Sequence, residues 1–449
     1  MNFLQSGFSF FIHFKFCGRR IAVLAACCFI CDLSLQAADA QPNVYVQKIL
    51  VANRPGFEAG ALIDEHLVNP WGIALRPPGV GGHIWISNAG NASTSTYVGD
   101  AHGEPLHQDG LKIVYLGGPL ISYEDGLANV TGQVYNAASD FPKQPVEFPV
   151  SGPASNLSKG APVPIGTIAG SAKFIFVTTD GTINAWRSGT AASMDSAIIV
   201  KDYSDHGPDQ IHSLRRLPAF TGVAISINAQ ANNRLYVADF QNNTIRVLDN
   251  QWADITASVP FARPNGMRAD FSPFNIQLLD GRLYIAFAAL DPNSDEPGTD
   301  IPAPGAGQVV AYDLDGHIVQ EFADSGRLNS PWGVAIAPKN FGPFGGALLV
   351  GNFGDGTIAA FDLGTGKFRN YLRDAAGQPI SLDGLWGLAF GNGVSLGDAD
   401  SLYFAAGPNG EQDGIFGRLR YAGPPDNVAP AKPATPPTAS APNSRPDPR

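Results

Sequence analysis

Short apolar runs separated by turn residues fill most of the chain, and the stretch around residue 330 shows this pattern in full. Residues 330–337 begin Ser-Pro-Trp-Gly and continue as an apolar run, and residues 347–352 form a second run. Gly354-Asp355-Gly356 then offers residues that tolerate the backbone angles of a tight turn. Two further runs follow at residues 357–362 and 367–373. The pattern predicts four antiparallel strands in about 45 residues, the size of one propeller blade.

Copies of this unit recur in one fixed order along the chain. The start of the first strand reappears at Asn69-Pro70-Trp71-Gly72 and at Leu385-Trp386-Gly387, with weaker copies near Thr221 and Phe274. The turn before the third strand reappears as Asp180-Gly181 and as Asn242-Asn243. Unrelated hairpins with common turn residues are the alternative, but several matches in the same order favour a repeat.

A repeat of about 55 residues predicts an all-β fold with one closed array, a six-bladed β-propeller. Residues 44–51 precede the first unit, and the last unit, residues 385–420, has only three strand candidates. We expect the N-terminal strand to complete this last blade, because closure removes open sheet edges. Residues 131–202 hold five strand candidates where four are needed, so seven blades is the alternative count.

The composition fits many short strands and narrows the range of partners. Glycine, with 51 residues, and proline, with 36, are abundant, and only 15% of residues are charged. The formal net charge is −11, and basic residues do not cluster. This charge argues against nucleic acid and anionic membranes as partners, and we expect a monomer.

The first 40 residues have the features of an export signal. Basic residues precede an apolar run at residues 21–35, and small residues before Gln41 fit a cleavage site. We therefore expect residues 1–40 to be a signal peptide and the protein to be exported, to the periplasm or the extracellular space. A retained membrane anchor is the alternative, although Asp32 interrupts the run and leaves it short for a span.

All four cysteines lie in this N-terminal segment, so the mature domain has no disulfide and no cysteine metal site. The residues that end at Cys27 also fit a lipoprotein signal, and Arg19-Arg20 resembles a twin-arginine signal. General secretion is the first expectation among these three export routes.

The composition changes again after Tyr421. Residues 422–449 contain nine prolines and no aromatic residue. Such a segment cannot bury enough apolar surface to offset the entropy of ordering. We expect a propeller domain at residues 41–421, a disordered Pro/Ala-rich tail at residues 422–449, and no membrane span in the mature protein.

The Asn/Ser-Pro-Trp-Gly starts resemble the inner strands of NHL-type and TolB-like six-bladed propellers. At closer range the chain resembles an uncharacterised bacterial family of secreted propeller-like proteins. The resemblance covers roughly residues 45–420 and implies a propeller fold and an export route, but no activity. The matching pieces are residues 67–74, 174–186, 272–277, 329–362 and 383–393.

Loops around one mouth of the expected channel carry the candidate ligand-binding residues. In a propeller this mouth gathers the loops that lead into first strands and those that join second to third strands. Indole rings, carboxylates and amides there suit a sugar, a lactone or a cation. The alternative is structural, with tryptophans as wedges between blades and Asp or Asn as turn residues. The candidates are Trp71, Asn88, Asp180, Asp239, Trp332, Asn352, Asp355, Trp386 and Asn409.

Residues 291–300 contain four carboxylates, and Ca²⁺ prefers oxygen-rich loops of this kind. The spacing matches no EF-hand, and two prolines favour a solvated acidic loop instead. Ca²⁺ is the candidate cofactor, and the sequence does not identify its ligands.

Two classes of function agree with the sequence. The first is an exported non-catalytic propeller that binds a small ligand, a glycan or a protein through one mouth. The second is a metal-dependent hydrolase or lactonase, as some six-bladed propellers are, which needs a cation held by several inward side chains. None of the residues directly before the first strands is a glutamate, which favours binding, and the sequence assigns no catalytic residue.

Overall fold

The computed structural model describes residues 41–423, apart from residues 78–80, 118–128, 141–144, 157–161, 191, 205–216, 227–231, 295 and 323–324. Contacts divide the chain into two units, Met1–Ala40 and Gln41–Arg449, and only the second contains described residues. The expected signal peptide, its cysteines and residues 424–449 of the expected tail lie outside them. Of the segments that the structure describes, none is a helix with the length and hydrophobicity to cross a bilayer.

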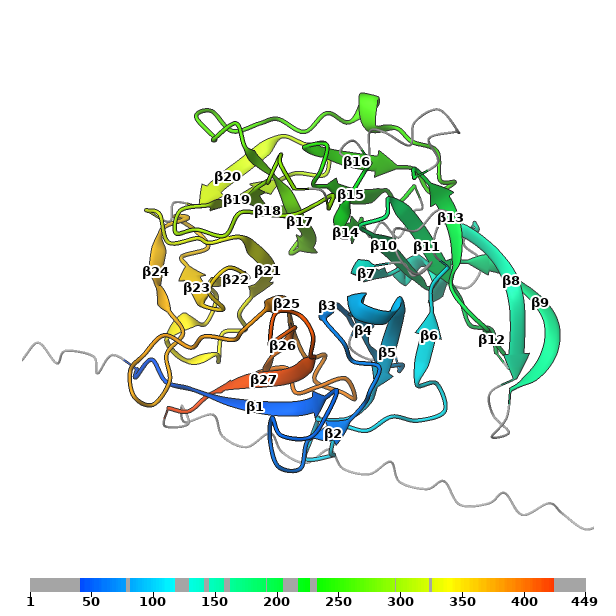
Figure 1. The fold of residues 1–449 in the computed structure, drawn as a ribbon, viewed down its shortest axis with the longest axis horizontal. Coiled ribbons are helices and arrows are strands. Elements are labelled where there is room, and N and C mark those ends of the chain that lie inside the picture. The colour runs from blue at the N-terminus through cyan, green and yellow to red at the C-terminus, as the bar shows by residue number, and fades with distance from the viewer. Residues whose placement is uncertain are drawn as a thin grey trace, which may run out of the picture. The chain divides into compact units, whose positions relative to one another are not determined.

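The described chain is almost entirely β-structure, and six of its sheets repeat one antiparallel strand order (Figure 1). We call the first strand of each of these sheets its inner strand. The inner strands are β3 (Pro70–Ala74), β7 (Val130–Tyr135), β14 (Phe220–Ile225), β17 (Phe271–Leu279), β21 (Pro331–Ile336) and β25 (Leu385–Phe390).

The second strands are mostly buried along their whole length, because neighbouring sheets cover both of their faces. They are β4 (Ile84–Asn88), β10 (Phe174–Thr178), β15 (Leu235–Asp239), β18 (Arg282–Ala289), β22 (Leu348–Asn352) and β26 (Leu402–Ala406). The third strands are β5 (Ser93–Tyr97), β11 (Thr182–Trp186), β16 (Thr244–Leu248), β19 (Gly307–Tyr312), β23 (Ile358–Phe361) and β27 (Ile415–Tyr421).

Outer strands complete five of the six sheets, and the β14–β15–β16 sheet has three strands. Four outer strands follow their third strand in sequence. They are β6 (Ile113–Tyr115), β13 (Ile198–Asp202), β20 (Ile318–Phe322) and β24 (Phe368–Tyr371). Short 3₁₀ turns interrupt the connections at η1 (Ala89–Asn91), η2 (Ala137–Asp140), η4 (Thr256–Ser258) and η5 (Gly342–Phe344).

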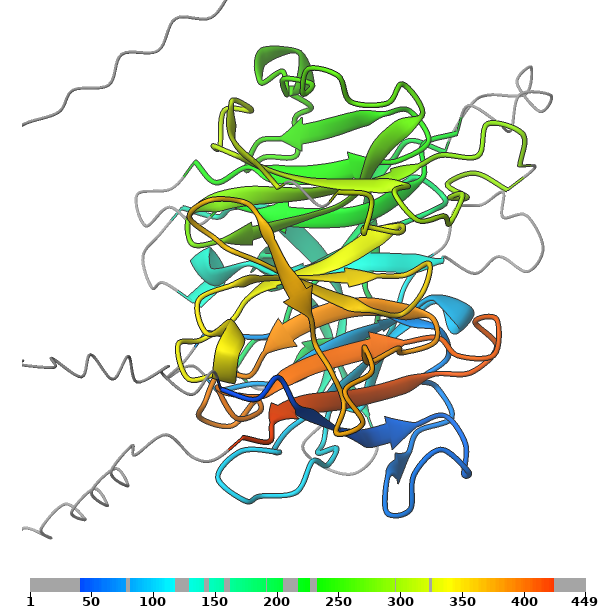
Figure 2. The ribbon, with the colours of Figure 1, turned by 90° about the vertical axis from the view of Figure 1, so that its left-hand side faces the viewer.

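The outer strand of the last sheet comes from the other end of the domain. Strand β1 (Tyr45–Ala52) pairs antiparallel with β27, from Tyr45 opposite Tyr421 to Ala52 opposite Ile415. Figure 2 shows the two strands side by side, β1 in blue and β27 in red. Strand β2 (Leu62–Ile63) adds to β1 in parallel. The predicted pairing of the N-terminal strand with the last sheet is therefore present.

The irregular region between residues 131 and 202 divides into two sheets. Strands β7, β10, β11 and β13 form one repeat of the common order. One of the five strand candidates was surplus to this repeat. It belongs to a separate sheet of β8 (Pro149–Asn156), β9 (Val163–Ser171) and β12 (Ser193–Met194). Strands β8 and β9 extend away from the inner strands in Figure 1. Strands β8 and β9 are inserted between β7 and β10, and β12 is inserted between β11 and β13, which explains the surplus candidate.

Inner strands contact one another in the order β3, β7, β14, β17, β21 and β25, and β25 contacts β3 again. Five of the inner strands have glycine as their third residue, and Asn275 takes the corresponding position in β17. A Cβ atom on Gly132 would lie 2.8 Å from the backbone nitrogen of Val223 in the next sheet. A cavity of about 20 Å³ remains among the inner strands, room for about one water molecule. The described inner strands therefore leave little space between them at this cavity.

Candidate functional site

Both kinds of predicted loop meet at one end of the sheets, because each inner strand begins where its neighbouring second strand ends. Pro70 pairs with Asn88, and Pro331 pairs with Asn352. We call this end the tryptophan rim. It comprises the loops that lead into the inner strands and the loops that join second to third strands. All nine candidate residues come from these loops or from the strand ends beside them.

The three tryptophans lie together in a buried aromatic cluster with Phe240 and Phe274. Trp71 stacks on Trp386 with ring centroids 3.4 Å apart, and Trp332 meets both rings edge-on at 5.9 Å. Only 7% of Trp71, 3% of Trp332 and 1% of Trp386 is exposed. The rings pack against one another where the sheets meet, so they stabilise the rim and offer a ligand little aromatic surface.

Polar groups just before the inner strands hold this cluster in place. Asn69 Oδ1 accepts hydrogen bonds from the indole N–H of Trp71 at 3.1 Å and of Trp386 at 3.2 Å. Asn69 has φ 45°, and Ser330, at the same position before Pro-Trp, has φ 47°. Left-handed backbone costs free energy in residues other than glycine, and such strain concentrates at functional sites.

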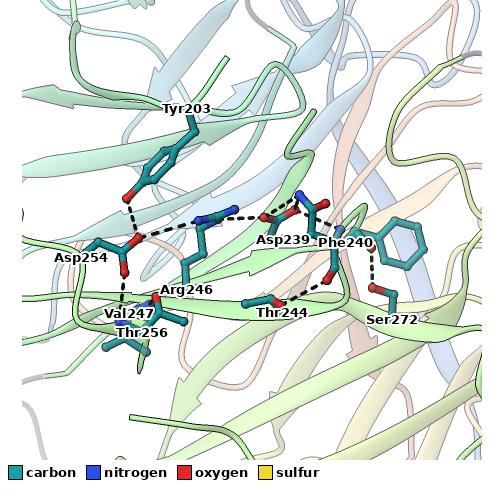
Figure 3. A network of polar contacts seen from close by, with 10 residues as sticks. Tyr203, Asp239, Phe240, Thr244, Arg246, Val247, Asp254, Thr256 and Ser272 are labelled. Carbon is teal, nitrogen blue, oxygen red and sulfur yellow. Dashed lines mark hydrogen bonds and ion pairs between the residues drawn. The ribbon is translucent and has the colours of Figure 1, made fainter. Parts of the chain in front are cut away.

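Asp239 lies in a buried ion pair with no exposed surface. Arg246 Nε donates to Asp239 Oδ2 at 2.8 Å, and the Asn242 backbone N–H donates to Oδ1 at 3.2 Å. Figure 3 follows this network from Arg246 to Asp254, whose carboxylate accepts from the Tyr203 hydroxyl at 3.1 Å. Burial raises the pKa of Asp239 although Arg246 and Asn242 oppose the shift. These contacts indicate that Asp239 stabilises the β15–β16 turn.

Asn88 and Asp180 are also buried at the tryptophan rim. Asn88 Nδ2 donates to Ser93 Oγ and to Ser95 Oγ, each at 3.0 Å, and so ties β4 to β5. Asp180 Oδ2 accepts the Asn129 backbone N–H at 3.0 Å, and burial raises the pKa of its carboxyl. Both side chains support the rim from within their own sheet.

Asn352, Asp355 and Asn409 lie on or beside the β22–β23 and β26–β27 connections. Asn352 is buried, and its Oδ1 accepts the Asn329 backbone N–H at 3.1 Å. Asp355 is exposed, accepts the Thr357 backbone N–H at 3.0 Å, and accepts Asn329 Nδ2 at 3.3 Å. Asn409 is exposed on the β26–β27 connection. The β22–β23 turn therefore positions Asn329, which the sequence did not single out.

Besides Asn88 Oδ1, four side-chain oxygens at the tryptophan rim are buried and have no hydrogen-bond partner among the described residues. They are Asp300 Oδ2, Asn329 Oδ1, Ser330 Oγ and Glu411 Oε1. They reach the rim from the β18–β19, β20–β21 and β26–β27 connections. Other buried atoms without a partner in the described part of the chain, such as Tyr135 Oη and Arg187 Nε, lie outside the rim. Each such group costs about 1–3 kcal/mol, so those at the rim call for an explanation.

Two of these oxygens belong to carboxyl groups that influence each other. Burial and the negative charge of Asp300 raise the pKa of Glu411 to about 7, although hydrogen bonding with Trp386 and Asn69 opposes the shift. Burial also raises the pKa of Asp300, and the nearby Ser330 hydroxyl opposes that shift. The rim therefore carries a carboxyl group that titrates near neutral pH.

The sequence missed Glu411, Asn69, Asn329 and Ser330 as site residues. Glu411 reaches the rim from the β26–β27 connection, whereas glutamate was sought only directly before the first strands. The sequence feature that could have identified Asn69 and Ser330 is their shared position directly before Pro-Trp. Asp300 was counted within the acidic loop at residues 291–300, and the structure brings this end of the loop to Ser330.

The comparisons by sequence find relatives without a known role. No protein-family model matches the chain, so membership of the bacterial family that it resembles is not shown. Two uncharacterised proteins of Acanthamoeba polyphaga mimivirus are 28% and 29% identical to it. Each match covers 82% of this chain, and they cover 78% and 84% of the viral proteins.

The solved structures that are similar share little sequence with this chain. An α-L-arabinofuranosidase from Fusarium graminearum is 12% identical with a TM-score of 0.45, over 84% of this chain and 97% of that one. A Penicillium chrysogenum α-L-arabinanase is 13% identical with a TM-score of 0.44, over 84% and 98%. A virginiamycin B lyase from Staphylococcus aureus is 12% identical with a TM-score of 0.36, over 84% and 99%. The chain is all-β and propeller-like in architecture, and these likenesses assign it no activity.

Proposed function

We propose that this protein is an exported six-bladed β-propeller, closed by its N-terminal strand, that binds a small molecule, a glycan or a protein at the tryptophan rim. The cyclic order of inner-strand contacts and the β1–β27 pairing support the blade count and the closure. The basic and apolar pattern of residues 1–40 supports export.

The observation that carries the proposed binding is the set of four buried oxygens without partners at the tryptophan rim. A folded protein ordinarily satisfies buried polar atoms, and exceptions gather where a ligand completes the hydrogen bonding. These atoms come from the β18–β19, β20–β21 and β26–β27 connections, at the end of the sheets where the aromatic cluster lies. Loops carried by a packed scaffold are the usual place of a binding site.

A hydrolase or lactonase is the second candidate function, and one observation favours it. The Glu411 carboxyl, with its pKa raised to about 7, can donate or accept a proton near neutral pH. Asp300 lies near enough to contribute to that shift. A pair of carboxyl groups with different surroundings is the usual acid–base equipment of hydrolases.

A thermal-shift screen of sugars, lactones and divalent cations on the full chain tests the binding proposal. A true ligand raises the melting temperature of the wild type, because it binds the folded state alone. We expect Asp355→Asn to reduce this rise, because Asp355 orients Asn329, and to change the melting temperature without ligand only slightly.

Asp362→Asn is the matched control. Asp362 accepts the backbone N–H and hydroxyl of Thr365, as Asp355 does with Thr357, but lies on the β23–β24 turn at the opposite end of the same sheet. Equal loss of the ligand response in both variants would contradict a site at the tryptophan rim.

A further inference from the structure

We propose that Asp300 and Glu411, together with the buried oxygens of Asn329 and Ser330, bind a divalent cation such as Ca²⁺ at the tryptophan rim. This inference rests on the proposed function, since it names the class of ligand that the same rim takes. The proposed site takes residues from two features that are separate in the sequence, the acidic loop at residues 291–300 and the tryptophan-bearing loops.

The donor atoms fit a hard cation. All four are oxygens, and Ca²⁺ binds carboxylate, amide and hydroxyl oxygens in flexible sets of six to eight, with water completing the shell. Asn329 is only 5% exposed, yet its Oδ1 has no partner among the described residues. Ser330 has no exposed surface, and its hydroxyl lies close enough to the Asp300 carboxyl to oppose the rise of that pKa by hydrogen bonding. One cation held among these oxygens would satisfy them together.

The charges at the rim favour a cation over a neutral ligand. Asp300 and Glu296 both act on Glu411 as negative charges. Within the described residues, neither Asp300 nor Glu411 forms an ion pair with an arginine or a lysine. Two half-buried carboxyl groups without a counter-charge are costly when ionised, and a divalent ion lowers that cost.

An organic cation fits the same charge less well. Recognition of alkylammonium groups relies on open aromatic faces. The rings of Trp71, Trp332 and Trp386 are packed on one another and are at most 7% exposed. Oxygen atoms, not ring faces, are what this rim presents.

The backbone that carries Glu411 is held in an unusual form. Asn409, Gly410 and Glu411 are consecutive left-handed residues with φ of 58°, 63° and 67°. Arg54 fixes the end of this turn by donating to both carboxylate oxygens of Asp413, at 2.7 and 2.6 Å. The turn is thus anchored to the segment that follows β1, which fixes the position of Glu411 before any ligand binds.

The site contains fewer charged ligands than a strong Ca²⁺ site. Among the described residues, no group of three or more His, Cys, Asp or Glu side chains is placed to hold a metal ion. Two carboxylates with neutral oxygens match weak sites, so we expect a Kd for Ca²⁺ of about 10⁻⁴–10⁻³ M.

Terbium luminescence tests this directly on the full chain, because Tb³⁺ occupies Ca²⁺ sites and is excited by nearby tryptophan. Trp386 lies within hydrogen-bonding reach of Glu411. We expect a saturable Tb³⁺ signal that excess Ca²⁺ displaces, and calorimetry with Ca²⁺ should give the same affinity. Glu411→Gln and Asp300→Asn should each weaken Ca²⁺ binding by at least about 10-fold.

Asp291→Asn is the control from the same acidic loop. Asp291 Oδ1 accepts the Asn293 backbone N–H at 2.8 Å, an ordinary turn contact, so its loss should leave Ca²⁺ affinity unchanged. If Asp291→Asn weakens binding as much as Asp300→Asn does, the acidic loop itself binds the ion and the proposed site is wrong.

Ser330→Ala decides the question if a carboxylate variant fails to fold. This substitution removes only the contact of the hydroxyl with the Asp300 carboxyl, so the protein should still fold while Ca²⁺ affinity falls. Unchanged affinity in Ser330→Ala, or no displaceable signal in the wild type, would overturn the inference. A sugar or lactone that still binds the wild type but not Asp355→Asn would then leave the proposed function standing, and the absence of both responses would reject both.

Discussion

Gly132 offers a direct test of how closely the inner strands approach. A Cβ atom at Gly132 would lie 2.8 Å from Val223 N and 2.9 Å from Gly222 Cα, both backbone atoms of β14. Carbon atoms pack best about 3.5–4.0 Å from their neighbours, so Gly132→Ala must move β7 and β14 apart by about 0.7 Å. Neither neighbour is a flexible side chain that can turn away.

The expected cost follows from two opposing effects. Overpacking a rigid contact typically destabilises a protein by about 1–3 kcal/mol. Replacing glycine by alanine where space is free instead stabilises by about 0.4–1 kcal/mol, because the unfolded chain loses freedom. The strain is larger than the gain, so we expect Gly132→Ala to lower the free energy of unfolding by about 1–2 kcal/mol.

Urea denaturation followed by circular dichroism and tryptophan fluorescence measures this change. Gly110→Ala is the matched control, because Gly110 is exposed and has nothing within 4 Å of an added Cβ. The control should be as stable as the wild type or slightly more stable. A Gly132→Ala protein with the stability of the Gly110→Ala control would refute the close approach of these two inner strands.

Three other predictions concern the N-terminal segment, the β1–β27 pairing and the Glu411 carboxyl group. N-terminal sequencing of the exported protein should find Gln41 or a close neighbour first; a lipid-modified Cys27 would contradict this. Deleting residues 44–51 should leave β27 as an open edge, lower the melting temperature and promote association, and an equally stable monomer by size-exclusion chromatography would argue against the pairing. In EDTA, stability should fall by an amount on the order of 3 kcal/mol between pH 4.5 and about 7, because the folded state keeps the Glu411 proton that the unfolded state has lost. Glu411→Gln should remove this part of the pH dependence, and a variant whose pH profile matches the wild type would exclude Glu411 as its source.

The repeated strand starts were readable from the sequence because each combines a local signal with a packing demand. Trp-Gly at residues 71–72, 332–333 and 386–387 marks the inner strands, since the ring must reach the centre and the glycine must admit the neighbouring strand. The inserted β8–β9 sheet was not readable in this way. Its residues alternate weakly and include Pro149 and Pro153, so one piece of it looked like a surplus blade strand.

The site was harder to predict than the fold, because its chemistry depends on which loops meet. Asp239 and Asp355 look alike in sequence, each after a strand and before a turn, yet one is buried against Arg246 and the other is exposed. Glu411 is distant in sequence from Asp300, and only the arrangement of the sheets brings them near enough for their charges to interact. Sequence patterns report strand periodicity well, but they do not report which polar atoms end up without partners.

The pairing of β1 with β27 also bears on how the chain reaches its folded state. Ala52 lies opposite Ile415, so the first strand to be synthesised waits for one that is 363 residues away. Contacts of such long separation form slowly, because the entropy of closing the loop must be overcome first. Until β27 has been synthesised, β1 lacks this partner strand. A chain that stops before residue 415 never contains the partner strand at all. The last sheet thus makes native folding conditional on complete synthesis, and premature termination products should be recognisable as aggregating or protease-sensitive chains.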